Sequence, residues 1–211
     1  MRPQTLGTYT PAATSANGLA NDVTSTGAAY TLAATTPDDS LAHIITILGN
    51  AATNHSAKTF TVVGTDAEGN AQTEGISGPN GVATVSTTKY FKTVTSVTPS
   101  ASTGSDTFDI GWTAVAVSPC LVLDFVANPF SCGLMTDISG TINYTVQHTL
   151  QSPFDALPAA LTWISNASPM ASATADQSSN YTVPVAATRL LINSVTATAT
   201  IKYTVLQARG N

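Results

Sequence analysis

Residues 141–150 alternate between two kinds of side chain, and this run constrains the fold more than any other stretch of the chain. One face would carry Ile142, Tyr144, Val146, His148 and Leu150. The other face would carry Thr141, Asn143, Thr145, Gln147 and Thr149. A strand turns successive side chains to opposite faces, whereas the period of a helix would mix the two sets. The run therefore predicts a β-strand.

Shorter runs of β-branched and aromatic residues predict further strands. They cover residues 41–48, 59–65, 71–76, 86–98, 108–112, 188–193 and 198–205. The segment 66–70 joins two of them and places Gly69 where a hairpin turn needs a positive φ. Short strands with frequent turn signals are typical of sandwiches and jelly rolls.

The chain has 211 residues, enough for two domains of about 100 residues each. The strand pattern pauses near residues 115–119, where we expect a domain boundary. The first 35 residues are rich in Ala, Thr, Ser, Gly and Asn and have little periodicity. We therefore predict an all-β protein: an extended N-terminal arm over 1–35, a β-sandwich domain over 36–117, and a second, jelly-roll-like sandwich over 118–211.

The composition favours a folded protein with few surface charges. Hydrophobic residues make up 43% of the chain and charged residues only 9%, against about 25% charged in typical soluble domains. Disordered chains have the reverse balance. Charge keeps proteins apart in solution, so a weakly charged surface favours association. This pattern supports a role in an assembly, although a secreted β protein has a similar composition.

The charge balance disfavours nucleic acid as a partner. The net charge is −5, and of the seven Lys and Arg residues only Lys89 and Lys92 lie close together. Binding to nucleic acid depends on many phosphate contacts from clustered cations. No run approaches the ~18 apolar residues of a membrane span, and the first seven residues carry no long apolar segment. We expect synthesis in the cytoplasm and reduced thiols at Cys120 and Cys132.

No catalytic, cofactor or metal site is predicted. A side-chain nucleophile needs a base within hydrogen-bond reach, and the three histidines show no metal-ligand spacing. His43 and His148 fall on strands and are expected to be packed, whereas His55 falls in a polar loop and is expected to be solvated. The step 38–39, a pair of aspartates, is interpreted as capping or solvated. The sequence therefore predicts a protein that is not an enzyme.

Three aromatic residues are candidate anchors for a neighbouring subunit. Phe130, Phe154 and Trp163 lie in the less regular segments, whereas the other aromatic side chains fall mostly at strand spacing. Aromatic side chains carry much of the binding energy at protein interfaces.

Two stretches resemble structural proteins of tailed bacteriophages. The first, within 59–112, comprises the elements 60–66 (FTVVGTD), 78–80 (GPN) and 88–97 (TKYFKTVTSV). The second comprises 141–149 (TINYTVQHT), 153–155 (PFD), Trp163, 180–181 (NY) and 203–207 (YTVLQ). Together they cover about the last three-quarters of the chain and carry no catalytic residues to transfer.

The resemblance implies a virion component without a cofactor, made in the host cytoplasm. We expect a capsid decoration or cement protein that contacts the major capsid protein or other virion proteins, and forms a homodimer or homotrimer because closed symmetry is usual. A head–tail connector or tail accessory protein is one alternative. A glycan-binding module for host attachment is a second. A glycosidase would need two suitably placed carboxylates, and no motif supports it.

Overall fold

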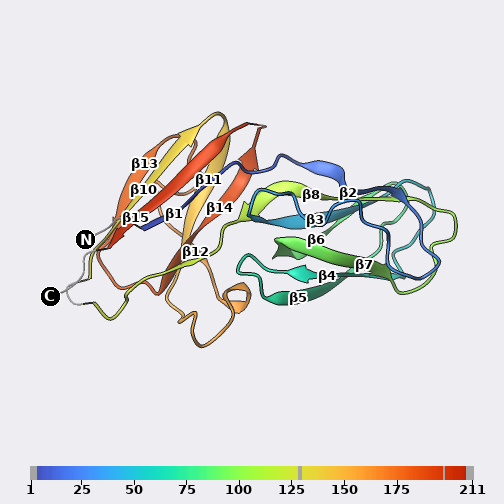
Figure 1. Cartoon of the computed structure of the whole chain (residues 1–211), viewed down its shortest axis with the longest axis horizontal. Helices are drawn as coiled ribbons and strands as arrows, with labels where there is room; N and C mark the ends of the chain where they lie inside the picture. The colour runs from blue at the N-terminus through green and yellow to red at the C-terminus, as the bar shows by residue number, and fades with distance from the viewer. Residues whose placement is uncertain (1–3, 128–129, 197, 208–211) are drawn as a thin grey trace. The chain divides into compact units, whose positions relative to one another are not determined.

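The computed structural model describes residues 4–127, 130–196 and 198–207. The chain divides into two compact units (Figure 1). Unit 1 comprises Met1–Ala13 and Val117–Asn211, and unit 2 comprises Thr14–Ala116. Within the described ranges the regular structure consists of strands and one turn of 3₁₀-helix, which confirms the all-β prediction.

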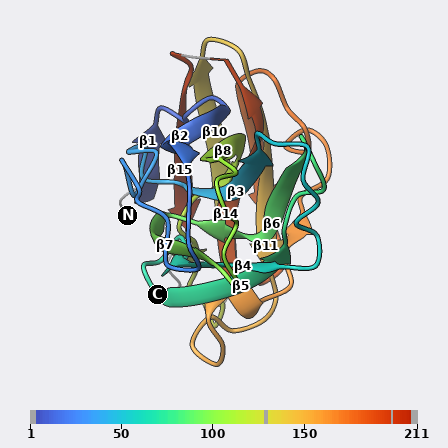
Figure 2. The ribbon, with the colours of Figure 1, turned by 90° about the vertical axis from the view of Figure 1, so that its right-hand side faces the viewer.

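Unit 2 contains two sheets. Its strands are β2 (Ser15–Val23), β3 (Ala42–Gly49), β4 (Thr59–Thr65), β5 (Ala71–Ser77), β6 (Thr84–Phe91), β7 (Thr93–Pro99) and β8 (Phe108–Val117). The last residue of β8, Val117, is assigned to unit 1. One sheet has the order β2-β8-β3-β6 and the other β5-β4-β7. Figure 2 shows β4, β5 and β7 in one layer and β2, β3 and β8 in the other.

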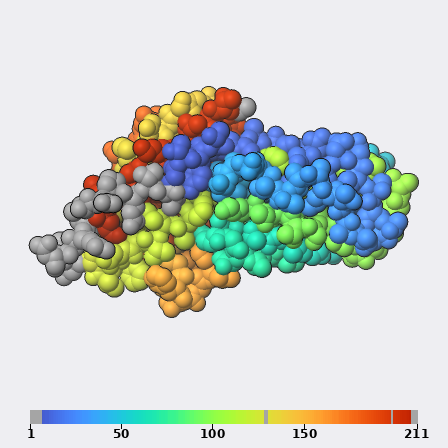
Figure 3. All heavy atoms as spheres, viewed as in Figure 1, coloured from blue at the N-terminus to red at the C-terminus, as the bar shows by residue number. Residues whose placement is uncertain are grey.

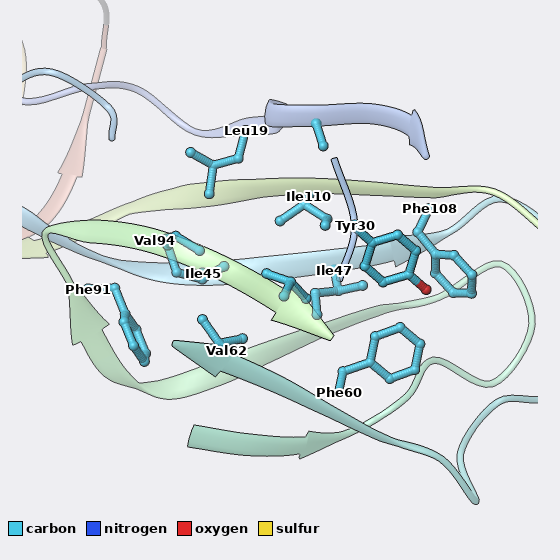
Figure 4. Packing of buried hydrophobic residues seen from close by; sticks show 12 residues of the cluster. Leu19, Tyr30, Ile45, Ile47, Phe60, Val62, Phe91, Val94, Phe108 and Ile110 are labelled. Carbon is cyan, nitrogen blue, oxygen red and sulfur yellow. The ribbon is translucent and has the colours of Figure 1, made fainter. Parts of the chain in front are cut away.

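The core of unit 2 fills the space between these sheets (Figure 4). Tyr30, Phe60 and Phe108 form its aromatic end, with ring centroids 5.3 to 6.1 Å apart. Ile45 and Ile47 of β3 extend the core along the sheet and are fully buried. The β-branched and aromatic runs that predicted β3 and β4 thus place their apolar residues in one shared core.

The prediction of one long strand over 86–98 is wrong. The chain turns at Lys92, so that β6 and β7 belong to different sheets. The turn brings Thr93 close to β4: a Cβ on Gly64 would lie 1.9 Å from the carbonyl oxygen of Thr93. The Lys92 amide donates to Thr65 at 2.8 Å and fixes the corner. Sequence periodicity cannot show a corner whose two arms are both strand-like.

Side chains of β5 connect the two sheets on their β6 side. The Glu74 carboxylate accepts hydrogen bonds from the amides of Thr88 (2.8 Å) and Lys89 (2.9 Å) and from the Thr88 hydroxyl (2.8 Å). Gln72 donates to the carbonyl of Tyr90. These side chains satisfy main-chain groups of β6 that would otherwise lie along a sheet edge.

The separate N-terminal arm over 1–35 is not confirmed. β1 (Gln4–Tyr9) pairs with β15 (Thr200–Gln207) of unit 1, and β2 pairs with β8 of unit 2. β2 approaches β8 so closely that a Cβ on Gly111 would lie 1.9 Å from the Ser15 carbonyl oxygen. Leu19 is fully buried, and the Tyr30 amide donates to Val97 at 2.8 Å. These few anchors suffice to fold a segment whose composition is that of a linker.

Unit 1 is built from the remaining strands. They are β1, β9 (Leu121–Val122), β10 (Cys132–Ser139), β11 (Ile142–Thr149), β12 (Ile164–Ser165), β13 (Gln177–Tyr181), β14 (Ala187–Val195) and β15 (Thr200–Gln207), with the 3₁₀ turn η1 (Pro158–Ala160). One sheet has the order β1-β15-β10-β13. In the other, β14 pairs with both β11 and β9, and β12 pairs with β11. The alternating run thus forms β11, although most of both its faces are buried.

Two buried tyrosines link the sheets of unit 1. Tyr203 of β15 hydrogen-bonds Thr188 of β14 at 2.8 Å, and Thr188 in turn donates to the Gln147 carbonyl at 2.9 Å. In the opposite direction, Tyr144 of β11 hydrogen-bonds Thr136 of β10. Both tyrosine side chains are fully buried. Each sheet therefore sends one hydroxyl into the other, which fixes how the two sheets pack.

The corner at Gly64 yields a stability prediction. Gly64→Ala should lower the free energy of unfolding by about 1–3 kcal/mol, because the methyl group would overlap backbone that cannot move without breaking the β4–β7 pairing. Gly133→Ala is the matched control, since its Cβ would meet nothing closer than 3.8 Å; it should leave stability unchanged or raise it by up to about 1 kcal/mol. Urea denaturation measures both. Equal effects of the two changes would contradict the close approach at Gly64.

The buried cysteine thiol and tyrosine hydroxyls of unit 1 yield a prediction of how stability depends on pH. Burial raises the pKa of Cys132 from 9.0 to about 11 and that of Tyr181 from 10.0 to about 12, and burial also raises the pKa of Tyr203 well above its ordinary value. The unfolded chain loses these protons first. The stability they contribute is therefore complete below pH 9 and is lost as the pH rises through 9 to 12.

Each unit carries one tryptophan, so fluorescence can report on the two units separately. An alkaline titration of Trp112→Phe, which keeps Trp163, should show unit 1 unfolding in this window. The same titration of Trp163→Phe, which keeps Trp112, should show unit 2 changing at higher pH, because unit 1 loses stability through three buried groups, Cys132, Tyr181 and Tyr203, whereas in unit 2 burial raises the pKa of Tyr30. If Trp112 changed first, the assignment of alkaline sensitivity to unit 1 would be wrong.

Candidate functional site

The structure places two of the three predicted anchors in one segment of unit 1. Phe154 and Trp163 both lie between β11 and β12, and Phe154 is 77% exposed. Trp163 is half-buried. Phe130, also half-buried, precedes β10 and lies outside this segment. We refer to residues 150–164 as the apolar loop.

The apolar loop exposes more large apolar side chains than the two predicted anchors suggest. Its exposed members range from 48% for Ile164 to 77% for Phe154, and they are Leu150, Phe154, Leu157 and Ile164. The loop, orange in Figure 3, stands out at the surface of the unit. Single exposed apolar residues are ordinary, but a group of them in one segment marks a surface that binds something.

Hydrogen bonds and two buried residues hold the apolar loop in place. Pro158 and Leu161 are buried, and η1 turns the chain between them. The Thr162 amide donates to the Gln151 side chain at 2.6 Å. At the end of the loop, Ile164 pairs with His148 of β11. The exposed side chains are therefore carried by a segment with defined structure.

A tryptophan–arginine stack lies at the base of the apolar loop. The Arg189 guanidinium lies 4.2 Å from the centroid of the Trp163 ring, and the indole N–H donates to the Pro158 carbonyl at 2.9 Å. The Nε of Arg189 donates to the Gln147 side chain at 2.9 Å, across the β11–β14 pair. Trp and Arg are the residue types that most often dominate binding energy at protein interfaces.

The histidines of unit 2 are both buried and both bonded to aspartate. His43 is fully buried, as expected; its Nε2 lies 2.7 Å from Asp39 and its Nδ1 2.8 Å from the Thr113 carbonyl. The expectation that His55 is solvated is wrong, because only 4% of this residue is exposed. The turn at 79–81 and the aromatic ring of Phe108 cover it.

His55 connects two charged side chains. Its Nε2 lies 2.9 Å from Asp106 and its Nδ1 lies 3.0 Å from the Lys58 amine. Hydrogen bonds from Thr53 and then from His55 lower the pKa of Asp106. The arrangement runs from carboxylate through imidazole to amine. Sequence reasoning missed it because Asp106 is 51 positions from His55, although the three-residue spacing of His55 and Lys58 was visible.

The third histidine lies in the core region of unit 1. His148 packs edge-on against Tyr181 at 5.1 Å, and burial lowers its pKa. Its packing confirms the sequence interpretation. Cys132 is buried, Cys120 is partly exposed, and no disulfide joins the two.

The predicted turn at 66–70 is confirmed. The Asp66 carboxylate accepts the amides of Glu68 (3.0 Å) and Asn70 (2.8 Å), and Gly69 adopts a φ of 89°. Asp39 accepts the Leu41 amide at 3.0 Å besides contacting His43, so one member of the acidic pair caps the turn before β3.

Comparisons with known proteins add no relative. No protein-family model matches the chain, and no curated protein matches its sequence significantly. Within residues 4–127, 130–196 and 198–207, no group of three or more His, Cys, Asp or Glu side chains is placed to hold a metal ion. The same residues include no helix long and apolar enough to span a membrane.

Proposed function

We propose that this chain is a non-enzymatic structural protein of a bacteriophage particle, a capsid decoration or cement protein that binds its neighbours through the apolar loop. The observation that carries the proposal is the exposure of four large apolar side chains on the structured apolar loop, next to the Trp163–Arg189 stack. These side chains are Leu150, Phe154, Leu157 and Ile164. Burying such side chains against a partner contributes about 25 cal/mol for each Å² of apolar surface removed from water.

The rest of the molecule suits this role. A chain with 9% charged residues offers little electrostatic resistance to close packing with neighbours. The resemblance of 59–112 and 141–207 to tailed-phage structural proteins supports the virion assignment. A head–tail connector or tail accessory protein would use the same kind of surface in fewer copies. The major capsid protein and further copies of this chain are the partners proposed.

A glycan-binding role fits the two tryptophans less well. Sugars stack on exposed aromatic faces, but Arg189 already occupies one face of Trp163. Trp112 packs on β2, where a Cβ on Gly18 would lie 2.2 Å from the indole ring. The protein itself therefore already covers part of each tryptophan ring.

Acidic substitutions in the apolar loop test the proposal. Leu157→Asp should reduce both incorporation into particles and self-association of the purified chain by about tenfold or more, because a carboxylate cannot be buried in an apolar contact without a partner. Quantitative mass spectrometry of purified particles and sedimentation velocity measure these two effects. Thermal unfolding should change little, since Leu157 is exposed.

Val82→Asp is the matched control. It introduces the same charge at an apolar residue that is 71% exposed in unit 2, far in sequence from the apolar loop. This variant should assemble like the original chain. If Leu157→Asp also assembled normally, the apolar loop would not be the contact surface.

A further inference from the structure

The side chains of Asp106, His55 and Lys58 form a hydrogen-bonded series in unit 2 that the structural role does not require. A lysine ammonium has hydrogen-bond donors only, so Lys58 donates to Nδ1 of His55 over 3.0 Å. Nε2 must then carry the ring proton and donates to Asp106 over 2.9 Å. This tautomer follows from the partners of the two ring nitrogens.

The same atoms suit a second position of the proton. If the proton moves from Lys58 to Nδ1, a neutral amine accepts a hydrogen bond from an imidazolium that still donates to Asp106. Both hydrogen bonds are kept, and the summed charge of the three groups does not change. The Asp106 carboxylate faces the imidazolium that the transfer creates. The geometry therefore provides a route to an unprotonated, nucleophilic lysine amine.

Burial differs along the series in the way a reactive amine needs. His55 is held by the hydrogen bond that its main-chain N–H donates to the Pro79 carbonyl at 2.9 Å and by the edge contact of its ring with Phe108. Asp106 is partly exposed, and its lowered pKa keeps it charged. Lys58 is also partly exposed, so a small reagent can reach its amine. A fixed base, an orienting carboxylate and an accessible nucleophile are the three parts of an activated nucleophile.

We propose that Lys58 is an acyl-acceptor site, with His55 as the base that removes its proton and Asp106 as the group that orients the imidazole. The substrates are activated acyl groups, such as carboxylic esters and thioesters. This inference goes beyond the proposed structural function and does not depend on it.

The reaction balances without an oxidant or a metal. His55 takes a proton from the Lys58 ammonium, and the amine lone pair attacks the acyl carbon. A C–N bond forms and the C–O or C–S bond breaks, so that an amide remains on Lys58 and an alcohol or thiol departs. The leaving group takes one of the two protons that the ammonium loses, and the other passes to solvent.

Acetylation by p-nitrophenyl acetate tests the proposal on the full-length protein. Peptide mass spectrometry gives the rate at Lys58 and, in the same sample, at the exposed Lys202. Lys58 should react at least about tenfold faster, because a positioned general base contributes about 10²–10⁴-fold. A Lys58 rate equal to or below that of Lys202 would overturn the proposal, and this comparison needs no variant.

Variants separate base catalysis from mere exposure. His55→Gln and Asp106→Asn should each bring the Lys58 rate to that of Lys202, while Lys202 itself is unaffected. Added imidazole should restore the rate in His55→Gly, an effect that a purely structural histidine would not give. Trp112 fluorescence reports whether unit 2 is folded in each variant. An excess rate that persisted in folded His55→Gln would show that His55 is not the base.

Discussion

Two tyrosine–threonine hydrogen bonds hold the facing sheets of unit 1 together, and the apolar loop depends on the packing that they fix. Tyr203 reaches Thr188 and Tyr144 reaches Thr136, so each hydroxyl crosses from one sheet to the other. A buried hydroxyl left without a partner costs about 1–3 kcal/mol, so these pairs disfavour any other alignment of the sheets. Thr188 adjoins Arg189, whose guanidinium stacks on Trp163 at the base of the apolar loop. The interior of unit 1 thereby positions its exposed surface.

Much of the fold was predictable from local pattern. The alternation at 141–150 and the hairpin at 59–76 are confirmed as β11 and as β4 with β5. Period-two alternation and turn residues act within a few positions of each other, so sequence alone carries them. β10 was missed because Cys132–Ser139 mixes Gly, Met and Asp and follows no clean alternation. Its place is set by pairing with β13 and β15, both distant in sequence.

Interactions between distant residues account for the wrong predictions. His55 looked solvated because its neighbours in sequence are polar, yet the turn at 79–81 and Phe108 bury it. The segment 1–35 looked like an arm because its apolar residues are few, yet Leu19 and Tyr30 are enough to anchor it. In the candidate site, aromatic type in an irregular segment selected Phe130, Phe154 and Trp163, of which Phe154 and Trp163 lie in the apolar loop, and their contact with a partner stays a prediction. Leu150 was instead assigned to the strand face, although β11 ends one residue earlier.

The copy number of the chain per purified particle tests the central claim most directly. Quantitative mass spectrometry against the major capsid protein would give it. A ratio near one, or a simple fraction of one, is the result expected for a protein that covers a shell. A handful of copies would move the proposed site of action to a connector or tail. Absence of the chain from the particle would contradict the structural role itself.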